Sequence, residues 1–272
     1  MAYLIDFDDP RTFPEELRQW DDDFIHKIQN AMNPLHTNLR NLDLQNEAIV
    51  SNFVKSHPND EVVVYHCTRI LDQNEYWHNG IVTGNGAGSV AEQRIRTLLM
   101  DIEVQQAKID EILQHMYVYW NRDKGARTTA VHFFGCKNRV YVNDQINVFA
   151  LNLGGETLRW VLAKIDEELY KKEPYKRLWI LGTPSVIKFK VKLCNIDPLD
   201  RPKLIAEILK YYIMTFFEEM SYSIEFTGKT TGSVPPEDII SIEEIKNFIE
   251  IQEKYPEFQG FYNELKWTGV NS

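Results

Sequence analysis

The stretch that decides the fold is Glu61–Gly84, EVVVYHCTRILDQNEYWHNGIVTG. Its β-branched run, Val62–Val64, is typical of a buried strand, because branched side chains pack well on a pleated surface. A short helical turn over 74–79 follows and ends at Gly80. Since side chains alternate along a strand, each face carries its own set: His66 and Thr68 on one, and Tyr65, Cys67 and Arg69 on the other.

His66 has two interpretations at this point. A histidine and a threonine hydroxyl at the end of a buried strand, followed by a turn closed by glycine, form one wall of a pocket. Alternatively, the strand is simply part of the core and a backbone carbonyl satisfies the His66 ring. The stretch alone leaves both interpretations open.

The composition is that of a globular protein that can bury a substantial core. The chain has 272 residues, of which 43% are hydrophobic and 26% charged, and its net charge is −10. A broad, non-specific grip on nucleic acid needs many cations, so this charge disfavours it without excluding a local basic groove.

Cysteine usage and the N-terminus predict a cytoplasmic protein. The three cysteines are widely spaced and form no CxxC pair, which favours a reducing compartment. MAYLIDFDDP lacks the basic and apolar regions of a signal peptide. No apolar run reaches the ~18 residues of a membrane span, so we expect no membrane partner.

The remaining elements predict an α+β fold, because helices and strands interleave without regular βαβ spacing. We expect a helical N-terminal cap over residues 1–56, whose first helix starts at the capping box Thr12-Phe13-Pro14-Glu15. Residues 57–272 would form a second, catalytic unit packed with the cap into one compact body. Ser89-x-x-Glu92 caps a long helix with an apolar stripe that reaches Trp120.

Two further segments have a bearing on function. Ile180–Leu193 alternates apolar residues with Lys188, Lys190 and Lys192, which predicts a half-exposed strand that shows its lysines to solvent. The glycine-rich run 84–88 predicts a mobile loop that covers a ligand, but its spacing is not a phosphate-binding fingerprint. No zinc signature and no GxSxG elbow occurs, so we expect no metal.

Three stretches taken together carry a resemblance: YHCTR, GTPSVIKFKVKL and YSIEFTGKTTGSVPPEDIISI. In this order they resemble the ADP-ribosyltransferase fold. That fold has a His-x-Thr-like motif on its first strand, a short helix ending in Gly-Ile, and a later strand with one glutamate before a Val-Pro-Pro-Glu-x-Ile segment. The corresponding residues here are His66, Thr68, Gly80-Ile81, Glu225 and 234–239. The resemblance spans about residues 60–245.

The resemblance implies two small antiparallel sheets that grip NAD, the substrate, in a cleft. By position, His66 would hydrogen-bond a ribose hydroxyl and Thr68 would touch the nicotinamide side. Tyr65, Arg69 and Gly80 would complete the NAD site, and Tyr141 would stack on nicotinamide. Alternatively, Tyr141 is an ordinary aromatic residue of the core.

Glu225 would be the catalytic carboxylate. Cleavage of the nicotinamide–ribose bond builds positive charge on the ribose, and a carboxylate near the 2′-hydroxyl stabilises that charge. The alternative for Glu225 is a solvated glutamate on an exposed strand face.

The predicted acceptor of the ADP-ribose group follows from a departure from the family pattern. Arginine-directed members carry Glu-x-Glu, but this chain has Ser223-Ile224-Glu225. The chain therefore resembles the His-type branch, which includes bacterial toxins. With two local basic clusters, Arg122, Lys124 and Arg127 in one and the three lysines of 188–192 in the other, this favours a nucleic acid, RNA or DNA, over a protein acceptor.

The function predicted from sequence is therefore a mono-ADP-ribosyltransferase that modifies a macromolecule, as a bacterial toxin or phage-defence effector controlled by an antitoxin protein. The alternatives are an NAD hydrolase or an RNA 2′-phosphotransferase of the same fold, and a catalytically silent binding module.

Overall fold

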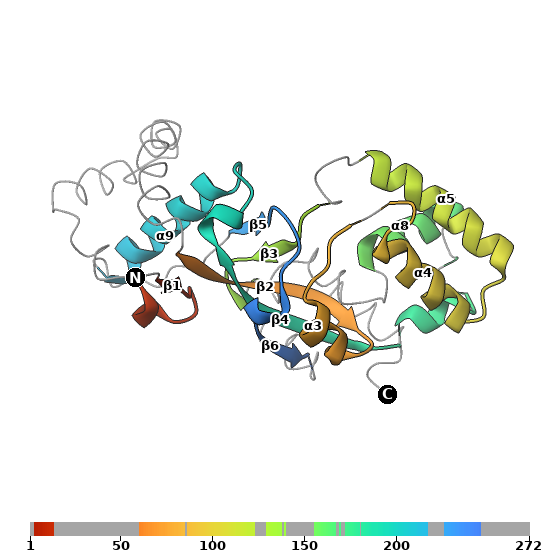
Figure 1. Cartoon of the computed structure of the whole chain (residues 1–272), viewed down its shortest axis with the longest axis horizontal. Coiled ribbons are helices and arrows are strands. Elements are labelled where there is room, and N and C mark those ends of the chain that lie inside the picture. The colour runs from red at the N-terminus through yellow and green to blue at the C-terminus, as the bar shows by residue number, and fades with distance from the viewer. Residues whose placement is uncertain are drawn as a thin grey trace.

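The computed structural model describes residues 3–13, 60–84, 86–122, 129–137, 139, 155–166, 169, 172–179, 181–216 and 226–245. The protein has an α+β fold with one mostly antiparallel sheet in the middle of the molecule (Figure 1). Helices lie at both ends of this sheet. The strands are β1 Leu4–Ile5, β2 Glu61–Ile70, β3 His132–Phe134, β4 Thr183–Lys192, β5 Thr227–Lys229 and β6 Ile239–Glu244. The longer helices are α3 Gln73–Asn79, α4 Val90–Asp101, α5 Gln106–Arg122, α8 Gly155–Ile165 and α9 Arg201–Phe216.

The centre of the sheet is the pair β2 and β4. They run antiparallel in unbroken register, from Glu61 opposite Lys192 to Ile70 opposite Thr183. The strand order is β5-β3-β2-β4-β6, and β1 lies parallel to the start of β2. All described strands thus belong to one sheet, whereas the resemblance implies two.

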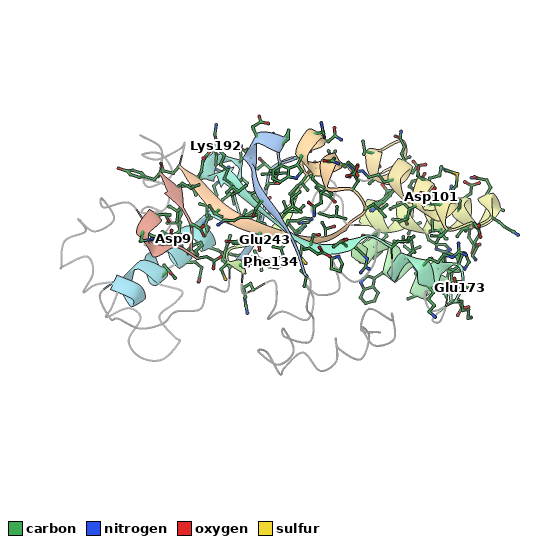
Figure 2. The ribbon with its side chains drawn as sticks, turned by 90° about the horizontal axis from the view of Figure 1, so that it is seen from below. Asp9, Asp101, Phe134, Glu173, Lys192 and Glu243 are labelled. Carbon is green, nitrogen blue, oxygen red and sulfur yellow. The ribbon has the colours of Figure 1, made fainter. Side chains whose placement is uncertain are left out.

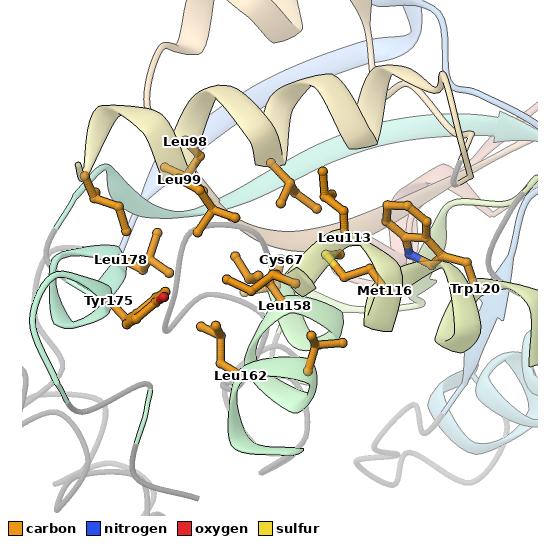
Figure 3. Packing of buried hydrophobic residues seen from close by; sticks show 14 of the residues in the cluster. Cys67, Leu98, Leu99, Leu113, Met116, Trp120, Leu158, Leu162, Tyr175 and Leu178 are labelled. Atoms are coloured by element: carbon orange, nitrogen blue, oxygen red, sulfur yellow. The ribbon is translucent and has the colours of Figure 1, made fainter. Parts of the chain in front are cut away.

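One face of the sheet is covered by helices. Val63, Tyr65 and Cys67 of β2 pack against α4, α5, α8 and the 3₁₀ helix η4 Tyr175–Trp179 (Figure 3). The helices contribute aliphatic residues at helical spacing, such as Leu98 and Leu99 of α4.

The opposite face carries a second apolar cluster. Val62 and Val64 of β2 lie there with Ile187 and Phe189 of β4 and with buried side chains of α9. Smaller pieces complete the cover: the 3₁₀ helices η5 Leu193–Asn195 and η6 Pro236–Asp238, and the single residues Ile81 and Val234. A sheet covered on both faces explains why β2 begins with three consecutive buried valines.

Residues 3–13 belong to the main body, which differs from the expected helical cap. β1 pairs with β2, the 3₁₀ helix η1 Pro10–Thr12 follows, and the buried Phe13 stacks on Tyr211 of α9 at 5.2 Å. The Thr12 hydroxyl accepts a hydrogen bond from the Asp6 amide at 2.8 Å. The rest of the expected cap, 14–56, lies outside the described residues. The division of the chain at 56/57 stays a prediction.

The expected single long helix after Ser89 is in fact two helices. Ser89 caps α4 as expected, accepting from the Glu92 amide at 3.1 Å. The chain then leaves the helix at Ile102, and Glu103 adopts a left-handed backbone with φ 66° before α5 starts. Because the chain turns at this break, the apolar stripes of α4 and α5 both pack into the same core. Neither Gly nor Pro marks the break.

Among the described residues, no helix combines the length and the apolar character that crossing a membrane requires.

Candidate functional site

His66 lies half-buried on the face of β2 that carries the second apolar cluster. Its Nδ1 is 2.8 Å from the backbone carbonyl oxygen of His132 on β3. Because a carbonyl only accepts, Nδ1 carries the proton and donates, which leaves Nε2 as an acceptor in the neutral ring. Burial lowers the pKa of His66 from its usual 6.5, which favours this neutral form.

The structure therefore supplies the backbone partner that the core interpretation of His66 requires. That partner engages Nδ1 and not Nε2. Because the ring is only half-buried and Nε2 keeps its lone pair, a hydroxyl donor remains a suitable partner for Nε2. The two interpretations of His66 are thus compatible.

Thr68 lies on the same face, two residues further along β2. It is half-buried, as is Tyr76 on the following helix α3. Burial raises the pKa of Tyr76, so the phenol stays protonated at neutral pH.

Gly80 closes α3 and is indispensable to the geometry there. Asp72 caps the start of α3 by accepting from the Asn74 amide at 2.9 Å, and the Gly80 amide donates to the Tyr76 carbonyl at 2.8 Å. Gly80 has φ 72°, and a Cβ built on it would lie 2.0 Å from the carbonyl oxygen of Val234. Only glycine therefore fits.

The segment after Gly80 joins the segment before η6, as the order of the motifs suggested. Ile81 and Val234 exchange two backbone hydrogen bonds, of 2.9 and 3.0 Å. The Thr83 amide donates to the Ser233 hydroxyl at 2.9 Å. We call residues 80–83 and 233–235 the closure. It connects the end of β2 to a segment about 150 residues later in the chain.

Tyr65 and Arg69 lie on the other face of β2, away from His66. Tyr65 is buried, and this burial raises the pKa of its phenol. Arg69 is buried as well, donates from Nε to the Leu181 carbonyl at 2.5 Å, and has a pKa lowered by burial to about 10. A ligand that contacts His66 and Thr68 would not reach these two side chains.

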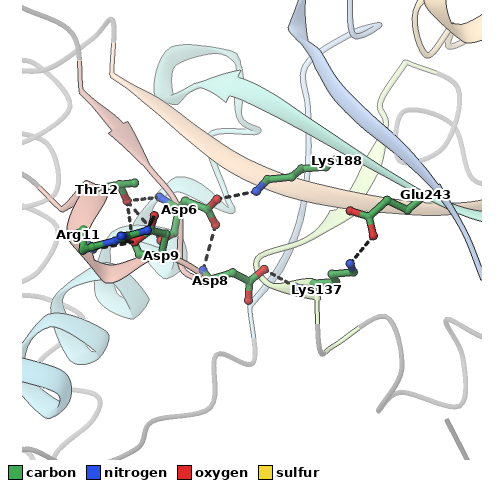
Figure 4. Close-up of polar contacts among 8 residues, drawn as sticks. All are labelled: Asp6, Asp8, Asp9, Arg11, Thr12, Lys137, Lys188 and Glu243. Carbon is green, nitrogen blue, oxygen red and sulfur yellow. Dashed lines mark hydrogen bonds and ion pairs between the residues drawn. The ribbon is translucent and has the colours of Figure 1, made fainter. Parts of the chain in front are cut away.

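The β4 lysines are not the solvent-facing row that the alternation predicted. Lys188 Nζ lies 2.8 Å from a carboxylate oxygen of Asp6 and 5.8 Å above the Tyr65 ring (Figure 4). Lys190 pairs with Glu61 at 3.2 Å and with Asp238 at 3.6 Å. β4 is a central strand, so its neighbours supply carboxylates. Lys192, at the end of β4, is exposed (Figure 2).

A series of ion pairs and hydrogen bonds around Asp6 holds the N-terminal segment on the sheet (Figure 4). An Asp6 carboxylate oxygen accepts from the Asp8 amide at 3.0 Å, and Asp8 accepts from the Lys137 amide at 3.0 Å. Lys137 in turn forms an ion pair with Glu243 of β6. These contacts serve the fold, and none of them involves His66 or Thr68.

The candidate catalytic residue Glu225 and the candidate binding residues Tyr141, Lys124 and Arg127 lie outside the described residues. The residue after Glu225 is described. The Phe226 carbonyl accepts from the Gly135 amide at 2.9 Å, and the Phe226 ring packs on Phe133. β5 then pairs with β3 from Thr227 onward.

A pocket of about 210 Å³ lies between the closure and the end of β4. Its wall includes the Lys190–Asp238 ion pair, Asn195, Thr231 and Ser233. Neither His66 nor Thr68 lines it. Ser233 and Val234 belong to both the pocket wall and the closure, so one short segment connects the two places.

Comparison of the chain with protein-family models, with curated proteins and with solved structures gave no match.

Proposed function

We propose that this protein is a mono-ADP-ribosyltransferase that transfers ADP-ribose from NAD to a macromolecule. The observation that carries the proposal is the meeting of three distant stretches. The strand with His66 and Thr68 pairs fully with β4, and the helix that follows it is closed by Gly80 against Val234-Pro235. These are the stretches on which the resemblance rests.

The chemistry of His66 and Thr68 fits the ribose of NAD. A neutral imidazole with a free acceptor at Nε2 suits a hydroxyl donor, and a ribose offers two neighbouring hydroxyls. The Thr68 hydroxyl can both donate and accept a hydrogen bond. Among the residues named from sequence we therefore retain His66, Thr68 and Gly80 for the NAD site, and we leave out Tyr65 and Arg69 because of their burial on the other face.

In the proposed reaction the bond between ribose C1′ and the nicotinamide nitrogen breaks, and its electron pair leaves with nicotinamide. The acceptor atom forms the new bond to C1′ and releases its proton to solvent. Glu225 would stabilise the positive charge that develops on the ribose. The protein would act in the cytoplasm as a toxin or phage-defence effector, under the control of an antitoxin protein.

For the acceptor we propose a nucleic acid, although the structure removes one of the sequence observations that favoured it. Lys188 and Lys190 are paired with carboxylates, so they no longer support a phosphate-binding strand. What remains is the basic cluster Arg122, Lys124 and Arg127, together with the Ser223-Ile224-Glu225 pattern. This pattern lacks the second carboxylate that would activate the strongly basic guanidinium of an arginine acceptor.

Incubation with NAD labelled in the adenylate part, together with separate RNA, DNA and protein fractions, tests the function. We expect label on RNA or DNA, with transfer that falls steeply between about 50 and 200 mM salt. Label on protein alone would overturn the acceptor but keep the transferase. Nicotinamide release without label would indicate an NAD hydrolase, and no NAD turnover would contradict the proposal.

Glu225→Gln should lower transfer by at least about a hundredfold, because it removes a charge that acts only in the transition state. Glu237→Gln, an exposed glutamate of η6, is the matched control and should transfer normally. Near-native turnover by folded Glu225→Gln would refute the catalytic assignment.

His66→Ala should weaken NAD binding by about 1–3 kcal/mol, because a ligand hydroxyl would lose its acceptor. Isothermal titration calorimetry measures this change. His78→Ala, on the exposed side of α3, is the control. Unchanged affinity in His66→Ala would leave His66 with its core role only.

A further inference from the structure

The pocket between the closure and the end of β4 offers space for a ligand that the proposed function does not use. Its volume of about 210 Å³ equals that of about seven water molecules at ~30 Å³ each. Sites for drug-sized ligands begin at roughly 300 Å³, so this pocket fits a single ring. Asn195, Thr231 and Ser233 of its wall are exposed, so a small molecule can reach them from solvent.

The charged groups of the wall favour a neutral ligand. Lys190 Nζ donates to both carboxylate oxygens of Glu61 at 3.2 Å, whereas Oδ1 of Asp238 lies 3.6 Å away. An anion would meet the carboxylates of Asp238 and Glu61, and a cation would have to compete with Lys190 for Asp238. A neutral ligand avoids both kinds of repulsion.

The wall also combines hydrogen-bond acceptors with donors. Because Asp238 Oδ1 lies beyond hydrogen-bond distance of Lys190, its carboxylate keeps lone pairs for ligand hydroxyls. Burial raises the pKa of Asp238, which shows that its charge is incompletely solvated. The Asn195 amide carries two N–H donors, and the Thr231 hydroxyl, which donates to the Asn195 carbonyl at 3.2 Å, can still accept. A sugar hydroxyl both donates and accepts, so it matches both kinds of group.

We infer that this pocket binds the ring of a neutral, hydroxyl-rich monosaccharide, either free or at the end of a glycan. Val191, Val234 and Pro235 add apolar surface against which the ring carbons pack. Ser233, which also lines the pocket, accepts from the Thr83 amide at 2.9 Å, so a bound sugar contacts the closure. The inference does not rest on the proposed function, because the pocket is lined by neither of the residues proposed to bind the ribose of NAD.

Saturation-transfer difference NMR on the full chain with D-glucose and D-galactose tests the inference. We expect one of them to bind with a dissociation constant of about 1 mM, because a single ring makes few contacts. The 2-amino sugar and the uronate of the sugar that binds are its cationic and anionic analogues, and each should bind at least about fivefold more weakly. The methyl glycoside, whose anomeric oxygen is blocked as in a glycan, separates the two sources: its binding supports a glycan end, and its failure to bind supports a free sugar.

Two variants place the binding in this pocket. Asp238→Ala should weaken it at least about tenfold, because hydrogen bonds to a carboxylate are the stronger kind. Asn195→Ala, at an exposed position, should weaken it about threefold and keeps the test valid if Asp238→Ala fails to fold. Asp101→Ala removes an exposed carboxylate at the end of α4 and is the control, which should bind normally. Absence of binding by both sugars, stronger binding of a charged analogue, or unchanged binding in the folded variants would overturn the inference.

Discussion

The two faces of β2 are built from alternate residues of one strand, yet they are covered in different ways. Val63, Tyr65 and Cys67 lie under long amphipathic helices and are almost fully enclosed. On the other face, the strand starts with buried Val62 and Val64 but ends with half-buried His66 and Thr68, where the cover consists of α3 and the closure.

The difference shows what each kind of cover can do. A helix of three or more turns removes a continuous apolar stripe from water and leaves little space for a polar side chain. A short capped helix and two bridged segments are held by hydrogen bonds and one glycine, so they enclose polar groups without apolar contacts on every side. The end of this face that small pieces cover, near His66 and Thr68, is therefore where a site can form.

A substitution in the closure should have the largest effect on the difference between the two faces. Gly80→Ala places a Cβ against the Val234 carbonyl in a backbone region that suits only glycine. We expect the free energy of unfolding to fall by ~4 kcal/mol from strain and from loss of the Ile81–Val234 hydrogen bonds. Urea unfolding measures the change. Gly232→Ala, where a Cβ meets nothing within 4 Å, is the control and should be nearly neutral.

If Gly80→Ala kept wild-type stability, the closure would not hold the small-piece face together, and the contrast between the two faces would lose its physical basis.

Leu99→Ala addresses the helix-covered face alone. Leu99 of α4 is fully buried, so truncation should leave a cavity and lower the free energy of unfolding by ~3 kcal/mol. NAD affinity of the folded protein should stay at the wild-type value, because the cavity lies on the far side of the sheet from His66. Met100→Ala, at the neighbouring exposed position, should change stability by less than ~0.5 kcal/mol. A loss of NAD affinity in Leu99→Ala would show that the two faces are coupled.

The smallest expected effect is a pH dependence that originates at His66. Its pKa is lowered in the folded state by burial, so between that value and 6.5 the unfolded chain binds a proton that the folded chain does not. This contribution to stability is complete above pH 6.5 and is lost as pH falls below it. One proton limits the slope to ~1.4 kcal/mol per pH unit. Urea unfolding between about pH 5 and 8 should therefore show a shallower fall below pH 6.5 in His66→Gln than in the wild type. Equal slopes would place His66 in a solvent-like environment.

The sequence predicted those parts of the fold that local patterns encode. The valine run and the alternation of Ile180–Leu193 gave β2 and β4, although β4 begins at Thr183. The Ser89 cap was correct, and so was a short helix ending at Gly80.

What local patterns could not predict depends on partners that lie far away in the chain. The lysines of β4 looked exposed because nothing near them in sequence is acidic, while Asp6, Glu61 and Asp238 come from other segments. The break at Glu103 has no Gly or Pro to mark it. Within the candidate site, His66 was predicted from its motif. A backbone carbonyl as the partner of His66 was one of the two interpretations, but the local pattern could not indicate that it belongs to His132, 66 residues later in the chain.

The pairing of β2 with β4 has a consequence for how the protein is made. Glu61 has to find Lys192, so the central pair cannot form until the later strand has left the ribosome. At about 5–20 residues per second, the nascent chain spends roughly ten seconds with its valine run unpaired. The helices α4 and α5 rely on neighbours in sequence and can form during this interval. A chaperone that shields Val62–Val64 over that time would therefore raise the yield of folded protein in the cell.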